Sequence, residues 1–251
     1  HQERLGLISA AALERRLQEL AQQDVRRDYE KYFLKPMVST QSFVTVSKGN
    51  SIWSNRFSVG QNWQSTNEVH AYNKRITLAY ASGLRPAKWL EITGRINYAL
   101  ITRKNDNNLP RASYPYDRML DANGYAAVVQ KDLPQWLKDS LHQGMKDWNF
   151  RPMNELQWRN KTFSGSYLRA SIGAALKMCK FLSFRFDYGM HLESGYLSDI
   201  HGENTYYNRF LVNKFTQTHS NTVVHIIPEG AIEDITKSNY HAHIGRAQCD
   251  L

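Results

Sequence analysis

The sequence predicts a mainly β protein: an antiparallel meander or barrel of about eight strands, preceded by an N-terminal α-helix. Apolar and polar residues alternate through two long stretches, 88–101 and 167–196, and a period of two is typical of strands. Aromatic residues make up 12% of the 251 residues, yet the mean hydropathy is only −0.58. Strands with one apolar and one polar face have this combination of properties.

The helix is predicted over residues 9–33. Ser9 is a suitable N-cap, apolar residues recur at helical spacing behind it, and Pro36 follows its end. The opposite face carries charges of both signs, as solvated helix surfaces do. The change of period after this helix predicts two parts, a helical segment over residues 1–36 and an antiparallel β domain over residues 37–251.

The β domain begins near residue 40, where the repeat changes to two residues. A short turn at 84–88 joins the stretch 88–101 to the strand before it, which predicts a hairpin. Residues 102–124 are dense in Asn, Asp, Pro and Gly and are predicted to form a loop, and a short helix should begin near Pro134. Further strands are predicted at 43–46, 52–63, 69–83, 125–130, 154–163, 205–215 and 222–227.

The clearest hairpin lies at 167–196. Phe184 and Phe186 flank Arg185 in its second half, and the first half alternates in the same way. A helix would scatter both sets around its axis, so two strands joined by a tight turn near 178–181 are predicted.

No motif of a phosphate-binding loop, a dinucleotide-binding turn, a zincin or a hydrolase nucleophile elbow occurs in the sequence. We therefore predict no catalytic residues and no cofactor, and a non-enzyme is expected over an enzyme. His241 and His243 have the one short spacing that suits metal ligands, and His225 is a third candidate. The alternative for these residues is ordinary surface histidines, and no metal site is predicted.

The net charge of +9 and the pI near 9.5 indicate an anionic partner, such as a phospholipid or lipopolysaccharide surface, an acidic glycan or nucleic acid. Nucleic acid is the less expected of these because the Lys and Arg residues are spread along the chain. No run of 18 apolar residues occurs, so no spanning helix is predicted. Strands of about 9–11 residues can nevertheless cross a bilayer.

The segments "KWLEITGRINYALITRK" and "YLRASIGAALKMCKFLSFRFDYGMHLESGY" resemble the strands of outer-membrane β-barrel proteins as a class. Short turns at 84–88 and 177–181 and long polar connections at 102–124 and 193–204 have the same asymmetry. The basic balance is similar to that of barrels from Bacteroidetes or mitochondria. The aromatic residues that would form the girdles at the strand ends are Trp53, Trp63, Trp89, Tyr167 and Tyr196.

This resemblance implies a pore, an anchor or a subunit of an envelope complex in the bacterial outer membrane, with the mitochondrial outer membrane as the second choice. Membrane lipid or lipopolysaccharide and protein subunits of that complex would be its partners. The apolar strand faces would meet lipid and the polar faces would line a lumen, which would favour anions if it conducts. The resemblance places these residues in the lumen: Glu91, Arg95, Arg169, Lys177, Arg185, Asp187, His191 and Glu193.

A soluble fold remains the alternative. The alternation is the same whether the apolar faces of the strands point outwards or inwards. The pattern therefore also fits a basic β-sandwich or calyx with an apolar core. Such a protein would be a binding or structural module in a larger assembly.

Overall fold

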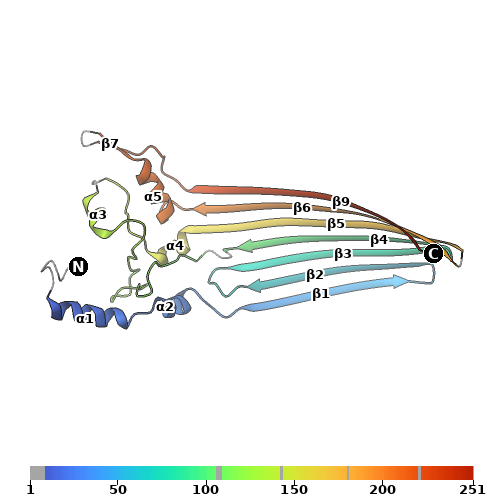
Figure 1. Cartoon of the computed structure of the whole chain (residues 1–251), viewed down its shortest axis with the longest axis horizontal. Coiled ribbons are helices and arrows are strands. Elements are labelled where there is room, and N and C mark those ends of the chain that lie inside the picture. Colours follow the sequence, from blue (N-terminus) through green and yellow to red (C-terminus); the bar gives the residue numbers. More distant parts are fainter. Residues whose placement is uncertain (1–8, 106–108, 142–143, 180, 220–221, 251) are drawn as a thin grey trace.

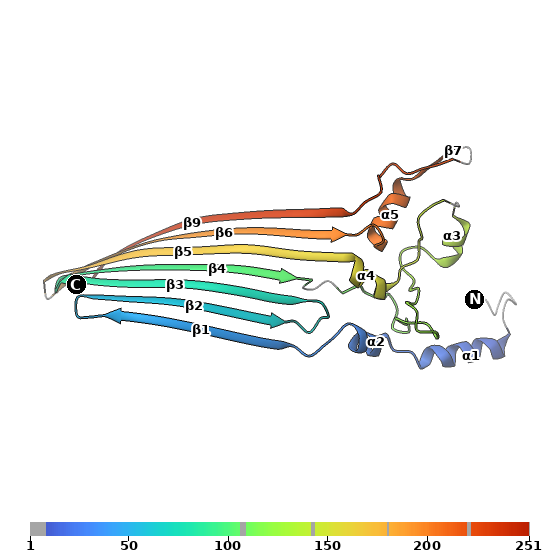
Figure 2. The same ribbon diagram turned by 180° about the vertical axis from the view of Figure 1, so that it is seen from behind.

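The computed structural model describes residues 9–105, 109–141, 144–179, 181–219 and 222–250. They form one large antiparallel sheet, with helices and loops gathered at one end of it (Figures 1 and 2). The mainly β fold with N-terminal helical structure is therefore confirmed.

Seven strands form the large sheet in the order β1-β2-β3-β4-β5-β6-β9, and each neighbouring pair is antiparallel. In the part of the chain that the structure describes, β1 and β9 are free edges and the sheet is not closed into a barrel. Two short strands form a separate pair. The strands are β1 (Val38–Gly49), β2 (Trp53–Ser65), β3 (Tyr72–Ala87), β4 (Leu90–Lys104), β5 (Arg159–Cys179), β6 (Leu182–His201), β7 (Gln217–His219), β8 (Thr222–Val224) and β9 (Ile232–Asp250).

The two ends of the large sheet differ. At the turn end, short turns join β1 to β2 and β3 to β4, and two residues lie between β5 and β6, so the predicted turn near 178–181 lies partly outside the described residues. At the loop end, longer segments connect the strands and carry the helices (Figure 1). Strands β1 to β4 have 12, 13, 16 and 15 residues, whereas β5, β6 and β9 have 21, 20 and 19.

The predicted N-terminal helix is interrupted. Its N-cap is confirmed, because the Ser9 side chain accepts a hydrogen bond from the backbone N–H of Ala12 at 3.2 Å. One continuous helix over 9–33 is wrong: α1 (Ala10–Ala21) ends, and α2 (Val25–Tyr32) starts afresh. The physical reason is Asp24, whose carboxylate accepts from the backbone N–H of Arg26 at 3.0 Å and caps a second helix.

Two segments predicted as strands are helical. Residues 206–215 form α5 (Tyr206–Phe215), because Thr205 caps its first turn through the backbone N–H of Asn208 at 3.3 Å. The start of the predicted strand 154–163 belongs to α4 (Pro152–Trp158), where the proline occupies the first turn.

One further predicted strand is wrong, and one strand of the structure was not predicted. Residues 125–130 make only isolated bridges, Leu120 with Ala126 and Val129 with Phe150. Strand β9 was not predicted, because charged and polar residues interrupt its alternation. The predicted helix after Pro134 is confirmed as α3 (Gln135–Ser140).

The hydrophobic clusters of the described residues lie at the loop end. One cluster joins Val25 and Phe33 to Met119, and the other joins Val129, Phe150 and Tyr206. These clusters fix the helices and the long loop to one another. The sheet itself has no comparable packed cluster on either face within the described residues.

Candidate functional site

One face of the large sheet is apolar over most of its width. The strand register places Phe57, Tyr80, Ile96, Ala170 and Met190 in one row across β2 to β6. The next row towards the loop end has the same character. Its members are Val59, Leu78, Tyr98, Leu168 and Leu192. We call this side of the sheet the apolar face.

The apolar rows form a band of limited height. In the three central strands the band covers Leu90–Leu100, Leu168–Leu176 and Phe184–Leu192. Beyond it, the same face continues with Ser166 and Ser194. Each apolar stretch therefore has the length of about 9–11 residues that a tilted strand needs to cross the hydrocarbon core of a membrane.

The described residues leave this band uncovered. Ile172, Phe186 and Tyr188 at its centre are 57%, 49% and 50% exposed. The helices lie beyond the loop end of the strands and not across the face (Figures 1 and 2). Complete burial of such a side chain stabilises a protein by about 1.5–3 kcal/mol relative to its exposure to water. Contact of the band with an apolar partner or with lipid would therefore be favourable.

Aromatic residues mark both limits of the band. Trp53 lies on the apolar face near the turn end, and Trp63 and Tyr196 lie on it beyond the last apolar rows. Lys237 Nζ is 5.9 Å from the centre of the Tyr196 ring. Tyr167 faces the other way, because it pairs with Glu193 on the polar side of the sheet. Its predicted place in an aromatic girdle is therefore wrong.

The opposite, polar face carries every residue predicted for a lumen. The register brings Arg169 of β5 opposite His191 of β6 and places Asp187 opposite Gly173. That this face lines a lumen stays a prediction. Its predicted members are Glu91, Arg95, Arg169, Lys177, Arg185, Asp187, His191 and Glu193.

Three carboxylates of the polar face already have close neighbours. Glu193 Oε1 lies 2.6 Å from His191 Nε2, and Glu91 Oε1 accepts from Arg85 Nη2 at 3.0 Å. The Asp187 carboxylate lies close to Gly173. A Cβ added at position 173 would be 2.6 Å from Asp187 Oδ1. A larger residue at position 173 would displace this carboxylate.

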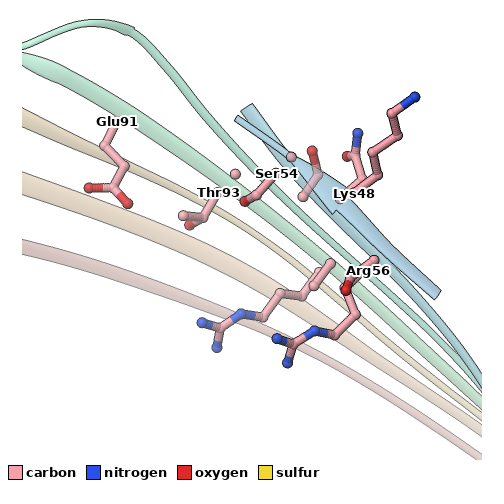
Figure 3. Close-up of a pocket in the computed structure, with 12 residues that line it drawn as sticks. Lys48, Ser54, Arg56, Glu91 and Thr93 are labelled. Carbon is pink, nitrogen blue, oxygen red and sulfur yellow. The ribbon is translucent and has the colours of Figure 1, made fainter. Parts of the chain in front are cut away.

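A hollow of about 430 Å³ opens on the polar face near the turn end (Figure 3). Small residues of β3, Ala81 and Gly83, lie in its floor, and Arg56 and Arg95 reach into it from the strands on either side. The remaining lining includes Ser47, Lys48, Ser54, Glu91 and Thr93.

The loop end contains a buried polar network that the sequence did not indicate. Arg209 of α5 donates to the backbone oxygens of Asn149 at 2.9 Å and Asn204 at 3.1 Å, and also to that of Asp147. Burial lowers the pKa of Arg209, and Asp147 and Glu155 oppose this shift. The arginine thus fastens the loop before α4 to α5.

Glu155 of α4 belongs to the same network. Its carboxylate accepts from the backbone N–H of Tyr206 at 2.7 Å, and the Tyr206 hydroxyl donates to Asp132 at 2.8 Å. Burial raises the pKa of Glu155, although this hydrogen bond and the charge of Arg209 act against the rise. Burial, and then the bond to Asp132, raise the pKa of the Tyr206 hydroxyl. The Thr205 cap before α5 is the signal that could have located this network.

The three histidines considered as metal ligands are held differently. His241 and His243 lie on the apolar face of β9, and His243 Nδ1 is 2.7 Å from the Tyr188 hydroxyl. His225 instead pairs with the Thr216 hydroxyl at 2.8 Å. The described part of the chain contains no group of three or more His, Cys, Asp or Glu side chains placed to hold a metal ion. It also contains no helix that is long and apolar enough to cross a membrane.

Comparisons with known proteins find similarity in solved structures alone. No protein-family model and no curated protein matches the sequence. The chain is similar to a chain of the RagAB peptide transporter, with a TM-score of 0.54 and 17% identity over 72% of this chain and 20% of that one. It is also similar to a chain of the RagAB peptide importer in the closed-closed state, with a TM-score of 0.54 and 15% identity over 86% of this chain and 23% of that one. At these identities the likeness is one of fold, and the chain spans only about a fifth of the length of those two chains.

Proposed function

We propose that this chain forms a section of the wall of an outer-membrane β-barrel, and that the barrel works in an envelope transport complex. The observation that carries the proposal is the apolar band, which has the height of a membrane core and lies opposite a polar face. The likeness in fold to chains of a peptide transporter supports the transport role.

The free edges of the sheet support a larger barrel. Strand β1 has 12 residues and β9 has 19, and within the described residues neither has a partner on its outer side. An unpaired strand inside a bilayer leaves N–H and C=O groups without hydrogen bonds, which costs several kcal/mol for each group. We propose that further strands of the same barrel pair with β1 and β9.

The asymmetry of the sheet sets its orientation in this proposal. Outer-membrane barrels have short turns on the periplasmic side and long loops outside. The turn end therefore faces the periplasm, and the loop end with its five helices of the described chain faces outwards. In this setting the lipid or lipopolysaccharide partner meets the apolar face, and protein partners meet the loop end.

Cysteine scanning along β6 tests this proposal. Cys179 and Cys249 are both exposed and free, so both are first replaced by Ser. Single cysteines then replace each residue from Phe184 to Leu192 in the full chain, in membranes. A water-soluble maleimide should label the positions of the polar face, such as Asp187, and a lipid-soluble one those of the apolar face, such as Phe186.

Carbonate washing of the membranes is the accompanying control. Retention of the chain together with alternating labelling would support the wall of a barrel. Release by carbonate, or equal labelling of both faces by the water-soluble reagent, would contradict it. The soluble β-sandwich or calyx predicts a different result. In that case the chain would stay soluble without detergent, and neither reagent would label Phe186→Cys because the residue would lie in an apolar core.

A further inference from the structure

We propose that the hollow near the turn end of the polar face binds a small oxyanion, held by the guanidinium groups of Arg56 and Arg95. The inference rests on the proposed function, because the polar face becomes an enclosed lumen only when the apolar face meets lipid. It adds a specific binding site, which neither the fold nor the similar structures assign.

The two arginines lie in one row of the sheet, on either side of Ala81. Arg56 of β2 pairs in register with Ala81 of β3, and Ala81 pairs with Arg95 of β4. The two Cα atoms are therefore separated by two strand spacings, about 9–10 Å, with only a methyl group between them. Figure 3 shows Arg56 among the residues that line the hollow, and Arg95 is the other arginine of this lining.

Neither positive charge is neutralised within the part of the chain that the structure describes. Arg56 and Arg95 form no ion pair there within 4.0 Å, in contrast to Arg85 and Arg159. One carboxylate, Glu91, lines the hollow, and it is bound to Arg85 at 3.0 Å. Two like charges placed this close repel each other, so an anion between them would relieve the repulsion.

The rest of the hollow suits an anion as well. The hydroxyl groups of Ser47, Ser54 and Thr93 line it, and they can donate to oxygens that the arginines leave free. Its volume of about 430 Å³ falls within the usual range of small-ligand sites, about 300–1,000 Å³. The small side chains of Ala81 and Gly83 keep this volume empty.

The basic surface continues beyond the hollow. Arg95 pairs with Ser171 of β5, and Arg169 lies two residues further along the same strand. Residues in such diagonal positions are about 7–8 Å apart. A ligand that leaves Arg95 could therefore contact Arg169 next. Arg169 lines a second hollow, of about 510 Å³.

Guanidinium groups bind carboxylates and phosphates through paired hydrogen bonds. The shared chemistry of the ligand is therefore a planar or tetrahedral oxyanion with at least two negative oxygens. A carboxylate of an acidic peptide and a phosphate group are its two possible sources, and the experiment below separates them.

Calorimetric titration of the full chain in detergent micelles tests the site at constant ionic strength. The probes are a blocked diglutamate peptide, inorganic phosphate and, as the neutral match, a blocked diglutamine peptide. We expect saturable binding of at least one anionic probe and none of the neutral peptide. Arg56→Gln and Arg95→Gln should each weaken this binding at least about tenfold.

Arg103→Gln is the matched control. Arg103 is on the same face but in another row, with its guanidinium carbon 5.4 Å from the centre of the Phe163 ring. Its replacement should change the affinity by less than about twofold, as expected for an exposed charge outside the site. The strand content of each variant, measured by circular dichroism, separates lost binding from lost folding.

The outcomes are distinct. Tighter binding of the diglutamate peptide than of phosphate identifies a carboxylate ligand, and the reverse order identifies a phosphate ligand. Absence of anion binding, or equal weakening by Arg103→Gln, would overturn the site even where cysteine scanning supports the barrel wall. If cysteine scanning contradicts the barrel wall but Arg56 and Arg95 still bind anions, the proposed barrel function fails and the anion site remains supported.

Discussion

At the scale of single residues, the loop end depends on polar groups that are buried and bonded. Glu155 is 9% exposed, and its carboxylate accepts the backbone N–H of Tyr206 at the start of α5. Arg209, which is 8% exposed, binds backbone oxygens of two loops. A buried acceptor or donor that loses its partner costs about 1–3 kcal/mol, so such residues tolerate little change.

The raised pKa of Glu155 predicts a pH-dependent stability. Because the pKa in the folded chain lies above the unfolded value of about 4.3, this group stabilises the fold fully below that value. The contribution is lost as the pH rises through the folded pKa. Glu155→Gln, which stays neutral, should therefore gain thermal stability relative to the original chain as the pH increases from about 4 to 7.

Melting temperatures of both proteins across this pH range check the prediction. Glu14→Gln on α1 is a suitable control, since Glu14 is exposed and should give parallel curves. A constant difference between the chain and Glu155→Gln at all pH values would show that the carboxylate titrates normally.

At the scale of elements, the short turns hold the register of the hairpins. Gly49 closes β1 against β2, and the backbone N–H of Asn50 donates to the carbonyl oxygen of Trp53 at 2.7 Å. A Cβ at position 49 would lie 2.8 Å from that oxygen and 2.9 Å from the Cα of Ser54. The backbone itself is the obstacle, so the turn would have to move.

Gly49→Ala is therefore expected to lower the free energy of unfolding by about 1–3 kcal/mol. Gly94→Ala is the control, because an added Cβ at Gly94 meets nothing within 4 Å. Denaturant unfolding in detergent, followed by circular dichroism, measures both. Equal stability of the two variants would mean that the turn adapts without cost.

The sequence predicts the strands in which apolar and polar residues alternate regularly. It does not predict elements that depend on helix capping or on pairing and packing with distant segments. Strands β3 to β6 follow from alternation because their apolar and polar residues fall on opposite faces of the sheet. Strand β9 carries Lys237, His241 and His243 on its apolar face, so its pattern is weak and its pairing with β6 determines it. Helix α5 follows from a Thr205 cap and from packing of Tyr206 into a distant cluster, neither of which produces a period.

The candidate site was predictable only in part. Alternation alone placed Glu91, Arg95 and Arg169 on one face, because side chains two residues apart share a face. It could not include Arg56 in the same row as Arg95, since that depends on the register of β2, β3 and β4. Nor could it show that Arg85 neutralises Glu91.

At the scale of the whole molecule, the large sheet has one apolar and one polar face, and the proposed barrel would place lipid against the apolar one. A charge on the lipid side of a barrel strand costs about 2–4 kcal/mol at the middle of the membrane. Ile172 lies at the centre of the apolar band, and its neighbour Ser171 faces the polar side. The two positions share a strand, a depth and a distance from both ends.

Ile172→Lys should therefore lower the stability of the chain in membranes by about 2–4 kcal/mol. Ser171→Lys, its matched control, should lower it by less than about 1 kcal/mol, since it faces the polar side and only repulsion from nearby charges such as Arg95 and Arg169 opposes it. Unfolding by guanidinium chloride in lipid vesicles, followed by tryptophan fluorescence, measures both. Similar losses at the two positions would contradict a lipid-facing Ile172.

The unequal strand lengths have a consequence for the mouth of the proposed barrel. Strands β5, β6 and β9 have 19 to 21 residues, whereas β1 to β4 have 12 to 16, and the longer ones reach farther at the loop end (Figure 1). The register assigns only three residues of this excess to the loop end, 159–161, 199–201 and 232–234, which span about 10 Å, and the rest of the excess lies at the turn end. In the proposed barrel the larger step between the two sides of the wall would therefore lie at the turn end, and the rim at the loop end would step by only three residues.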